Sequence, residues 1–422
     1  MTAGETAEEI QDPAAEDGGG PDRLLLSALA VGAFAIGTDS LVISGLLNRI
    51  ASDLSVSPAT TGQLISVFAL VYAVGAPVLA TVTAGFDRRR LLLVALTVFI
   101  AANVLGAVAP NYPVLLASRV LAAVGAGLYL PCAMVITVSV TPERWRGRGL
   151  AMVAGGMSAA TALGVPLGTL IGAVGDWRAT LVLVAVLATV AVAVLAKAVP
   201  RVAAPAAVTL GQRLRSAAHP QVLIALLANA LACAGEFTVM VYVAPLAEDV
   251  TGVGAAGVSA FLLVSGLAAL AGSAVGGRAA DRFGGRRAYN GAVAVLFGGL
   301  AALVLLTLAD GRGSWVTAGV FALLLCVVSV ASWALPPAQN HAIAGLDIPE
   351  PTVALSLNGS SSYLGLAMGG VLGGLAMEHG SSTTLTAAGA AVELSALALL
   401  LTTAVVTAKR RRATAPGPRP GK

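Results

Sequence analysis

Ionisable side chains inside apolar stretches are the residues of this sequence whose types and positions could do chemistry. Asp39 lies in FAIGTDSLVISG, and Arg119 lies in SRVLAAVGAG. Charged groups inside a membrane-spanning helix are rare, because an isolated one costs several kcal/mol, and they normally face a partner or a water-filled cavity. Both residues lie roughly 10 to 12 Å from the outer end of their stretches, at 1.5 Å per residue. The matching depths predict an ion pair between Asp39 and Arg119.

Such a pair could load and release a proton. Loss of water favours the neutral form of a carboxyl group, whereas a nearby arginine favours its ionised form. A cavity around Asp39 that is wet in one conformation and dry in another would therefore change its proton occupancy. The alternative interpretation is a static ion pair that only fixes the register of two helices.

Two glutamates in apolar stretches are further candidates. Glu236, in LACAGEFTVMVYVAP, is interpreted as a second proton-coupling site or a substrate contact, and the alternative is a solvated polar group in a cavity. Glu393, in AAVELSALALL, has no evident partner in the sequence, and no role is assigned to it.

The composition predicts that membrane-spanning helices position these residues. Of the 422 residues, 57% are hydrophobic and 11% are charged, whereas about a quarter of a soluble domain is charged. A spanning helix needs about 20 mostly apolar residues, and the strands of a membrane barrel would alternate apolar and polar residues instead. The sequence contains twelve such stretches, at residues 24–47, 60–84, 91–109, 113–140, 149–174, 178–198, 221–247, 255–276, 288–309, 314–337, 352–377 and 384–408.

The distribution of positive charge predicts the orientation. With the N-terminus inside, the cytoplasmic loops and tails hold 21 of the 25 Lys and Arg residues, and the outer loops hold three. Because Lys and Arg are enriched in cytoplasmic loops, we expect a multi-pass protein of the plasma membrane (in bacteria, the inner membrane) with both termini in the cytoplasm. Positive charge spread over loops meets anionic lipid head groups, and it does not indicate nucleic acid binding.

The twelve stretches form two similar sets of six. Asp39 and Glu236, in the first stretch of each set, are 197 residues apart. Internal repeats of this kind are typical of secondary transporters. We therefore expect an all-α integral membrane fold of twelve transmembrane helices in two pseudo-symmetric six-helix bundles. The expected segments are a disordered cytoplasmic tail (1–23), two bundles (24–198 and 221–408), a cytoplasmic linker (199–220) and a basic cytoplasmic tail (409–422).

Glycines recur at four-residue spacing in two stretches. The fifth stretch carries Gly164, Gly168 and Gly172 in LGVPLGTLIG, and residues 364–373 repeat the spacing in LGLAMGGVLG. Such spacing leaves a flat helix face that another backbone can approach closely, and Pro166 bends the helix by removing a backbone donor. We predict a tight, slidable contact between the bundles, and the alternative is helix packing without gating.

The loops after the second stretch of each set are candidate gates. GGRAADRFGGRR contains Gly277, Asp281 and Arg282, and TVTAGFDRRR contains Asp87 and Arg88. A carboxylate beside arginines at a helix end can form charge-assisted bonds between helices and hold the inner side shut. The alternative for the arginines is that they only determine topology.

An apolar cavity between the bundles would suit an amphiphilic organic molecule, because burial supplies affinity while a few polar groups orient the ligand. The residues expected to contact substrate are Gln63, Tyr72, Tyr129, Asn229, Tyr242, Asn340 and Asn358. The three cysteines and three histidines form no disulfide framework and no zinc motif. No loop carries a nucleophile and base motif or a phosphate-binding loop, so the sequence does not indicate an enzyme.

Several of these motifs resemble the major facilitator superfamily, specifically its twelve-span drug and proton antiporters related to chloramphenicol-efflux and arabinose-efflux-like proteins. The similarity covers about residues 24–408. IGTDSLVISGLLNRIASDLSVS resembles the first-helix stretch of that family, with Asp39 where a glutamate is usual. SRVLAAVGAG resembles the fourth-helix motif, whose arginine corresponds to Arg119. LGVPLGTLIG, followed by DWRAT, resembles the fifth-helix antiporter motif at Gly164, Pro166 and Gly168.

The gating loops resemble that family unequally. The second-half loop is similar to the gating motif of the family at Gly277, Asp281, Arg282 and Gly284. The first-half loop keeps the acidic and basic pair but is shorter, and it has Thr83 where the motif would open on glycine.

The resemblance implies alternating access around a central cavity, with export in exchange for protons. We therefore expect a proton-coupled multidrug or antibiotic efflux antiporter that acts as a monomer on a small-molecule substrate. The proton gradient would supply the energy, without a cofactor. The nearest alternative is a sugar or metabolite exporter, followed by an uptake symporter. A non-transporting membrane sensor is the alternative from another class, and the short tails disfavour it because they leave no room for a signalling domain.

Overall fold

The computed structural model describes residues 22–200, 202, 209–309, 312–346, 348 and 351–413, and within these residues every regular element is a helix. The expected disordered tail at 1–23 lies outside the described residues except for its last two, and so does the end of the expected basic tail, 414–422.

The first half of the chain forms six helical segments, one of which is subdivided. The helices are α1 (Arg23–Asp53), α2 (Pro58–Val82), α3 (Arg88–Ala107), α4 (Tyr112–Val140), the short turn η2 (Glu143–Trp145), α5 (Arg146–Ala159), the π-helical turn η3 (Ala160–Gly164), α6 (Val165–Val174) and α7 (Arg178–Ala198).

The second half repeats this pattern. Its helices are α9 (Pro220–Met240), α10 (Val243–Thr251), α11 (Ala255–Phe283), α12 (Gly285–Leu308), α13 (Trp315–Ala344), α14 (Pro351–His379) and α15 (Ser382–Ala413). Between the halves, α8 (Leu210–Ala217) lies in the expected linker. There Thr209 and Gln212 satisfy each other's backbone donors in a capping box, which explains a helix in a segment without a sustained apolar run.

The helix starts follow from local capping chemistry. The side chains of Ser57 and Asn111 accept hydrogen bonds from backbone N–H groups in the first turns of α2 and α4, and each of these helices has proline at its first or second position. Such residues satisfy donors that a helix leaves free at its N-terminus, and proline loses nothing there.

The predicted spans correspond to helices of the structure. Eleven segments within the described residues are long and apolar enough to cross a membrane. The remaining predicted span is α14, which has 29 residues but is not among the eleven. The polar run SLNGSSS at 356–362 makes this helix less apolar than its neighbours.

The seventh predicted span, 221–247, is not one continuous helix. Helix α9 ends at Met240, and α10 begins at Val243. Pro245 explains the break, because a proline clashes with the carbonyl group four residues earlier and cannot donate to it. That carbonyl belongs to Val241, in the turn between the two helices.

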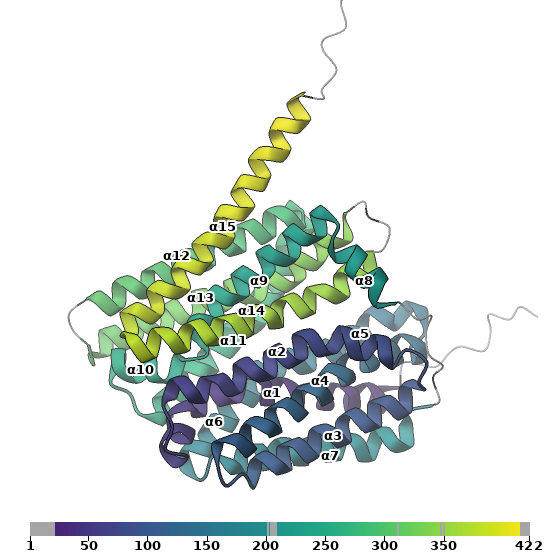
Figure 1. Ribbon diagram of the computed structural model, residues 1–422, viewed down its shortest axis with the longest axis horizontal. Coiled ribbons are helices and arrows are strands. Elements are labelled where there is room, and N and C mark those ends of the chain that lie inside the picture. Colours follow the sequence, from purple (N-terminus) through teal and green to yellow (C-terminus); the bar gives the residue numbers. More distant parts are fainter. Residues whose placement is uncertain are drawn as a thin grey trace, which may run out of the picture.

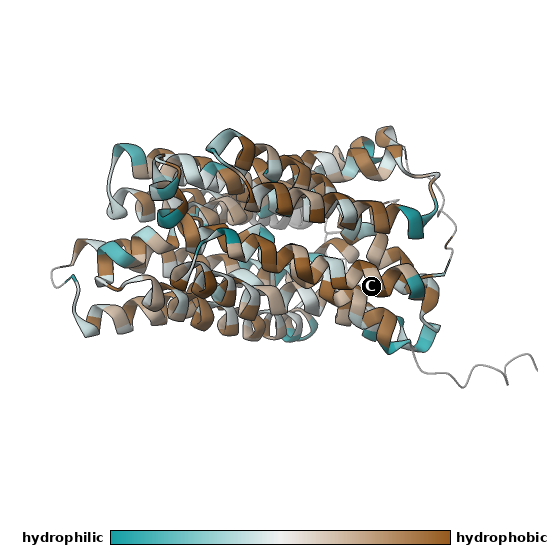
Figure 2. Ribbon diagram, turned by 90° about the horizontal axis from the view of Figure 1, so that it is seen from below, coloured by the Kyte–Doolittle hydropathy of each residue, from teal (hydrophilic) through white to brown (hydrophobic). Residues whose placement is uncertain are grey.

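The helices form two groups with nearly parallel axes (Figure 1). Helices α1–α7 make one group and α9–α15 make the other, while α8 lies at the end where the chain passes between them. Helix α2 packs along α14, and α6 packs along α11, so these two pairs join the groups. Apolar residues cover the middle of the helices and polar residues collect toward their ends (Figure 2), as expected for segments that cross a bilayer.

The glycine faces contact helices of their own half, so the predicted contact between bundles is wrong for these positions. Gly164, Gly168 and Gly172 lie against Thr38, Val42 and Leu46 of α1, which have the same four-residue spacing. In the second half, Gly365, Gly369 and Gly373 lie in the same way against α9. Spacing defines a flat face but not its partner. The flat faces instead pack the fifth and eleventh spans onto the helices that carry Asp39 and Glu236.

Candidate functional site: a buried ion pair and a central cavity

Asp39 and Arg119 form a buried, two-pronged ion pair between α1 and α4. Arg119 Nη1 donates to Asp39 Oδ1 at 2.9 Å, and Nη2 donates to Oδ2. Both residues are at most 2% exposed. A planar guanidinium matches the two oxygens of a carboxylate, and each charge removes much of the cost of burying the other.

Aromatic rings from α2 and α14 surround this ion pair. The Arg119 guanidinium lies 5.4 Å from the centre of the Phe68 ring. Tyr363 of α14 comes close enough to interact electrostatically with Asp39, and its ring stacks on Tyr72 of α2 with centroids 3.8 Å apart. The second half of the chain therefore covers the charged pair of the first half.

Sequence reasoning missed Tyr363. It stands in the serine and glycine run SSSYLGLAMGG, where it is the one aromatic residue. That pattern could have marked it as a candidate. Its role depends on a contact between α14 and α2, which no local pattern reveals.

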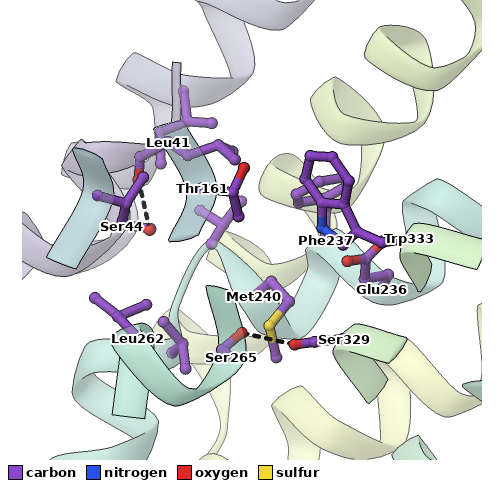
Figure 3. Close-up of a pocket in the computed structure, with 14 residues that line it drawn as sticks. Leu41, Ser44, Thr161, Glu236, Phe237, Met240, Leu262, Ser265, Ser329 and Trp333 are labelled. Atoms are coloured by element: carbon purple, nitrogen blue, oxygen red, sulfur yellow. Dashed lines mark hydrogen bonds between the residues drawn. The ribbon is translucent and has the colours of Figure 1, made fainter. Parts of the chain in front are cut away.

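A central cavity lies between the halves, and Leu41 and Ser44 of α1 form part of its wall (Figure 3). Its walls are mainly aliphatic and aromatic, with hydroxyl groups from Ser44, Thr161, Ser265 and Ser329. The hydroxyl oxygens of Ser265 and Ser329 lie 2.6 Å apart. The cavity volume is about 60 Å³, room for a few water molecules. Sites for drug-sized ligands measure roughly 300–1,000 Å³, so the halves must separate before such a ligand can bind.

Glu236 supplies the carboxyl group of this cavity. It lies on α9, is 5% exposed and lines the cavity beside Trp333. The Ser332 side chain lies close to its carboxyl group. No ion pair joins Glu236 to a described arginine or lysine. Its carboxyl group is therefore available to a proton or to a cationic group that enters the cavity.

Comparison with known proteins identifies the family. Residues 29–346 match the family model described as the Major Facilitator Superfamily. The chain belongs to the major facilitator superfamily. The chloramphenicol resistance protein of Streptomyces lividans is 38% identical over 263 residues, which cover 61% of this chain and 67% of that protein. The inner membrane transport protein YdhP of Escherichia coli (strain K12) is 31% identical over 376 residues, which cover 89% of this chain and 94% of that protein.

A solved structure supports the superfamily fold. The crystal structure of the peptide transporter POT in complex with sulfate aligns with a TM-score of 0.72, covering 92% of this chain and 95% of that chain at 15% identity. The expected all-α fold and the resemblance to the major facilitator superfamily are confirmed. The protein is a multi-pass membrane transporter. Among the described residues, no group of three or more His, Cys, Asp or Glu side chains could hold a metal ion.

The residues expected to contact substrate in this superfamily member do not line the cavity in this conformation. Tyr129 is fully buried, and its hydroxyl donates to the Leu29 carbonyl at 2.8 Å, which fixes α4 to α1. Tyr242 donates to the Gly370 carbonyl at 2.9 Å. Tyr72 is stacked on Tyr363 as described above. In this conformation their polar atoms or rings serve helix packing, and their contact with substrate stays a prediction.

The amides behave in the same way. Asn229 of α9 donates to the hydroxyl groups of Ser361 and Ser362 on α14, at 2.9 and 2.8 Å. Asn358 donates to Asn340 at 3.0 Å and so joins α14 to α13. These two contacts stay within the second half.

Gln63 lies outside the central cavity. It faces a separate apolar groove between α2 and α14. Like the other six residues expected to contact substrate, it therefore gains no support from the geometry of the central cavity.

The predicted gating residues are not engaged across the halves. Asp87 accepts a hydrogen bond from the backbone N–H of Arg90 and caps α3. Arg88 is largely buried and donates to the carbonyl oxygen of Ala84. Within the described part of the chain, no ion pair links Asp87 or Asp281 to the opposite half.

The second-half gating loop is exposed. Asp281 and Arg282 both face away from the protein, with the Arg282 guanidinium over the Phe283 ring. Gly277 has open space around it. Gly284, which joins α11 to α12, has φ +83°, a conformation that only glycine adopts readily. The loop therefore has the turn that a gate needs, without the bonds that would close it.

The hydrogen bonds that join the halves within the described residues lie at the opposite end, which the charge distribution predicts to be the outer end. Asn48 of α1 donates to Glu248 of α10 at 2.6 Å. The Tyr242 hydroxyl also lies 3.4 Å from the carbonyl oxygen of Ala59 on α2. The two halves are therefore held together at the predicted outer end. At the predicted inner end, the gating residues form no bonds between the halves.

Proposed function

We propose that the protein is a proton-coupled antiporter that exports small amphiphilic organic molecules. The observation that carries this proposal is the buried Asp39–Arg119 ion pair under the aromatic cover of the second half. A charge pair that only fixed helix register would not need a cover supplied by the half that moves.

The ion pair supplies a coupling mechanism. When the halves separate on the outer side, water reaches Asp39, and a proton can neutralise the carboxylate and weaken its bond to Arg119. When the halves close again, the restored contact with the Arg119 guanidinium favours the ionised form and outweighs the opposing effect of the lost water, so the proton leaves. One proton thus binds from outside and is released inside for each cycle of Asp39.

The cavity supports the assigned substrate class. Leu41, Ile65, Phe237, Met240 and Trp333 give it apolar walls, which bind organic molecules through burial. The Glu236 carboxyl group adds one site that can attract a cation. The name of the Streptomyces lividans relative, a chloramphenicol resistance protein, supports export of an antibiotic-sized compound.

Proton release from inverted membrane vesicles tests the proposal. The vesicles would be loaded by respiration, and a panel of antibiotics, cationic dyes and sugars would be added while a fluorescent dye reports internal pH. We expect antibiotics or cationic dyes to release protons from wild-type vesicles and not from Asp39→Asn vesicles. If only sugars caused proton release, the substrates would be sugars and not amphiphilic drugs. Release that persists in Asp39→Asn with unchanged pH dependence would remove Asp39 as the coupling site.

A further inference from the structure

Glu393 is a buried carboxyl group that the mechanism above does not use. It lies on α15, is 0% exposed, and neither of its side-chain oxygens has a hydrogen-bond partner. A buried polar group without a partner is costly, and an ionised one is far more costly. A leucine would avoid this cost, so packing alone gives no reason for a glutamate here.

Glu393 lies directly behind the residue that lines the central cavity. Gly235 of α9 is so close that a Cβ atom on it would be 2.6 Å from Glu393 Oε2. Glu236 is the next residue, and the two carboxyl groups interact electrostatically. The absence of a side chain at position 235 therefore brings a second acidic group next to the acidic group of the cavity.

Tyr289 continues this series of polar groups away from the cavity. It lies on α12 and is 2% exposed, and its hydroxyl has no hydrogen-bond partner. The hydroxyl interacts electrostatically with Glu393 and with Cys233. Because the hydroxyl and the carboxyl group do not bond directly, a proton could pass between them only through a bridging water or a rotation of the Glu393 side chain.

A second cavity begins at Tyr289. It measures about 360 Å³ and is lined by the ends of α9, α12, α13 and α15, including the polar residues Gln221, Arg286, Asn290 and Gln339. Asn290 Oδ1 is a further buried atom without a partner. Unpaired polar atoms around a space of this size are sites for ordered water. This cavity lies toward the end that the charge distribution predicts to be cytoplasmic.

The remaining titratable groups on helices that contact α15 lie elsewhere. Asp249 of α10 bonds to Ser382, at the other end of α15, and Glu378 and His379 terminate α14 at that same end. The titratable groups that face Glu393 are Glu236 and Cys233 from α9 and Tyr289 from α12.

We propose that Glu236, Glu393 and Tyr289 form a proton-release route through the second half, which leads from the central cavity to the cytoplasmic cavity and does not coincide with the substrate path. The proposal rests on the proposed function and deepens it. The Glu393 carboxylic acid passes its proton through the Tyr289 hydroxyl, which accepts one on its oxygen and donates its own, to water in the cytoplasmic cavity. Glu236 then gives its proton to Glu393, which becomes neutral again. Glu236 is left ionised, one water is left protonated, and the other two groups return to their starting forms.

A separate exit has a functional consequence that can be measured. A substrate that fills the central cavity would block proton release through it, but it would not block release through α9, α12 and α15. The route therefore predicts that substrate binding and proton release can be separated by substitutions at Glu393 and Tyr289.

The test uses the full chain with Glu393→Gln and Tyr289→Phe, both close in shape to the native residues. Glu378→Gln, an exposed change at the far end of α14, is the matched control. Substrate-stimulated proton release would be timed in inverted vesicles, and affinity for the same compound would be measured on purified protein. We expect about a tenfold or greater slowing of release in both variants, affinity within about twofold of wild type, and no effect in the control.

The outcomes separate this inference from the proposed function. If wild-type vesicles release protons and both variants release them at the wild-type rate, the route is wrong and the antiporter proposal stands. A parallel loss of affinity and release in Glu393→Gln would make Glu393 part of the substrate site and also overturn the route. If the wild type releases no protons with any compound, the antiporter proposal itself fails. Because Tyr289→Phe leaves the buried charges unchanged, it tests the route even if Glu393→Gln folds poorly.

Discussion

Gly164 of η3 lies directly against Thr38 of α1, the residue that precedes Asp39. The fifth span therefore sets the position of the carboxyl group that pairs with Arg119. The same arrangement recurs in the second half, where Gly365 of α14 lies against the backbone of α9 near Glu236. In each half, a glycine face supports the helix that carries an acidic residue.

Gly164→Val is expected to displace α1 and reduce coupling. Its side chain would collide with Thr38 and Phe34, and overpacking of this kind costs about 1–3 kcal/mol. Thermal stability in detergent and substrate-stimulated proton release would both fall. Gly155→Val is the control, because Gly155 lies in the same span with open space around it. Equal effects of the two substitutions would show that helix propensity, and not the contact with α1, is responsible.

The ion pair predicts a non-additive effect on stability. Asp39→Asn or Arg119→Gln alone leaves one buried charge without a partner, which costs about 3–5 kcal/mol. The double variant carries neither charge and should recover much of that loss. The measurement is a double-mutant cycle of unfolding free energies in mixed micelles. Additive losses would mean that the two side chains do not interact in the folded protein.

The closed outer end predicts a cross-link that stops transport. Cysteines in place of Asn48 and Glu248, whose side chains are bonded across the halves, should be joined by a short bifunctional thiol reagent, with the three native cysteines replaced. Holding α1 against α10 should abolish transport, and a cleavable reagent should allow recovery.

The control for this experiment is a cross-link within one half. Asp53 and Arg178 form an ion pair between α1 and α7 at 2.8 Å. Cysteines at these positions should be joined by the same reagent without loss of transport. If the Asn48 and Glu248 cross-link also left transport intact, the outer end would not open during the cycle.

The position of Glu236 in the cavity wall predicts that the protein binds cationic compounds more tightly than neutral ones. Glu236→Gln removes the carboxyl group of the cavity, so the affinity for a cationic compound should fall by about 2 kcal/mol, or roughly 30-fold. A neutral compound of the same shape should lose little. Equilibrium binding of such a pair of compounds gives the answer, with Ser265→Ala as a cavity-lining control. A similar loss for both compounds would show that Glu236 does not select charge.

The sequence was sufficient to locate the helices and the Asp39–Arg119 pair. Helix ends are marked by charges, prolines and capping residues. Two opposite charges at the same depth in a membrane avoid a large free-energy cost by pairing. The break after Met240 was also encoded, in Pro245, but the apolar run around it concealed the signal. A proline inside an apolar run should be weighted more heavily than hydropathy.

Tertiary contacts could not be predicted in the same way. The glycine spacing identified a flat face, but only the fold shows that α1 fills it. Asn229 is polar in an apolar stretch, as a substrate-binding residue would be, yet Ser361 and Ser362 satisfy it. Tyr363 and Tyr289 act through helices distant in sequence, so their chemical context appears only when the helices are packed.

The stacking of Tyr363 on Tyr72 also constrains the order of events in the transport cycle. These rings belong to opposite halves, so they must part whenever the halves swing away from each other at this level. The movement that opens the cavity to substrate would also move Tyr363 away from the Asp39 carboxylate. In the proposed antiport cycle, substrate entry and hydration of Asp39 would therefore occur in one movement.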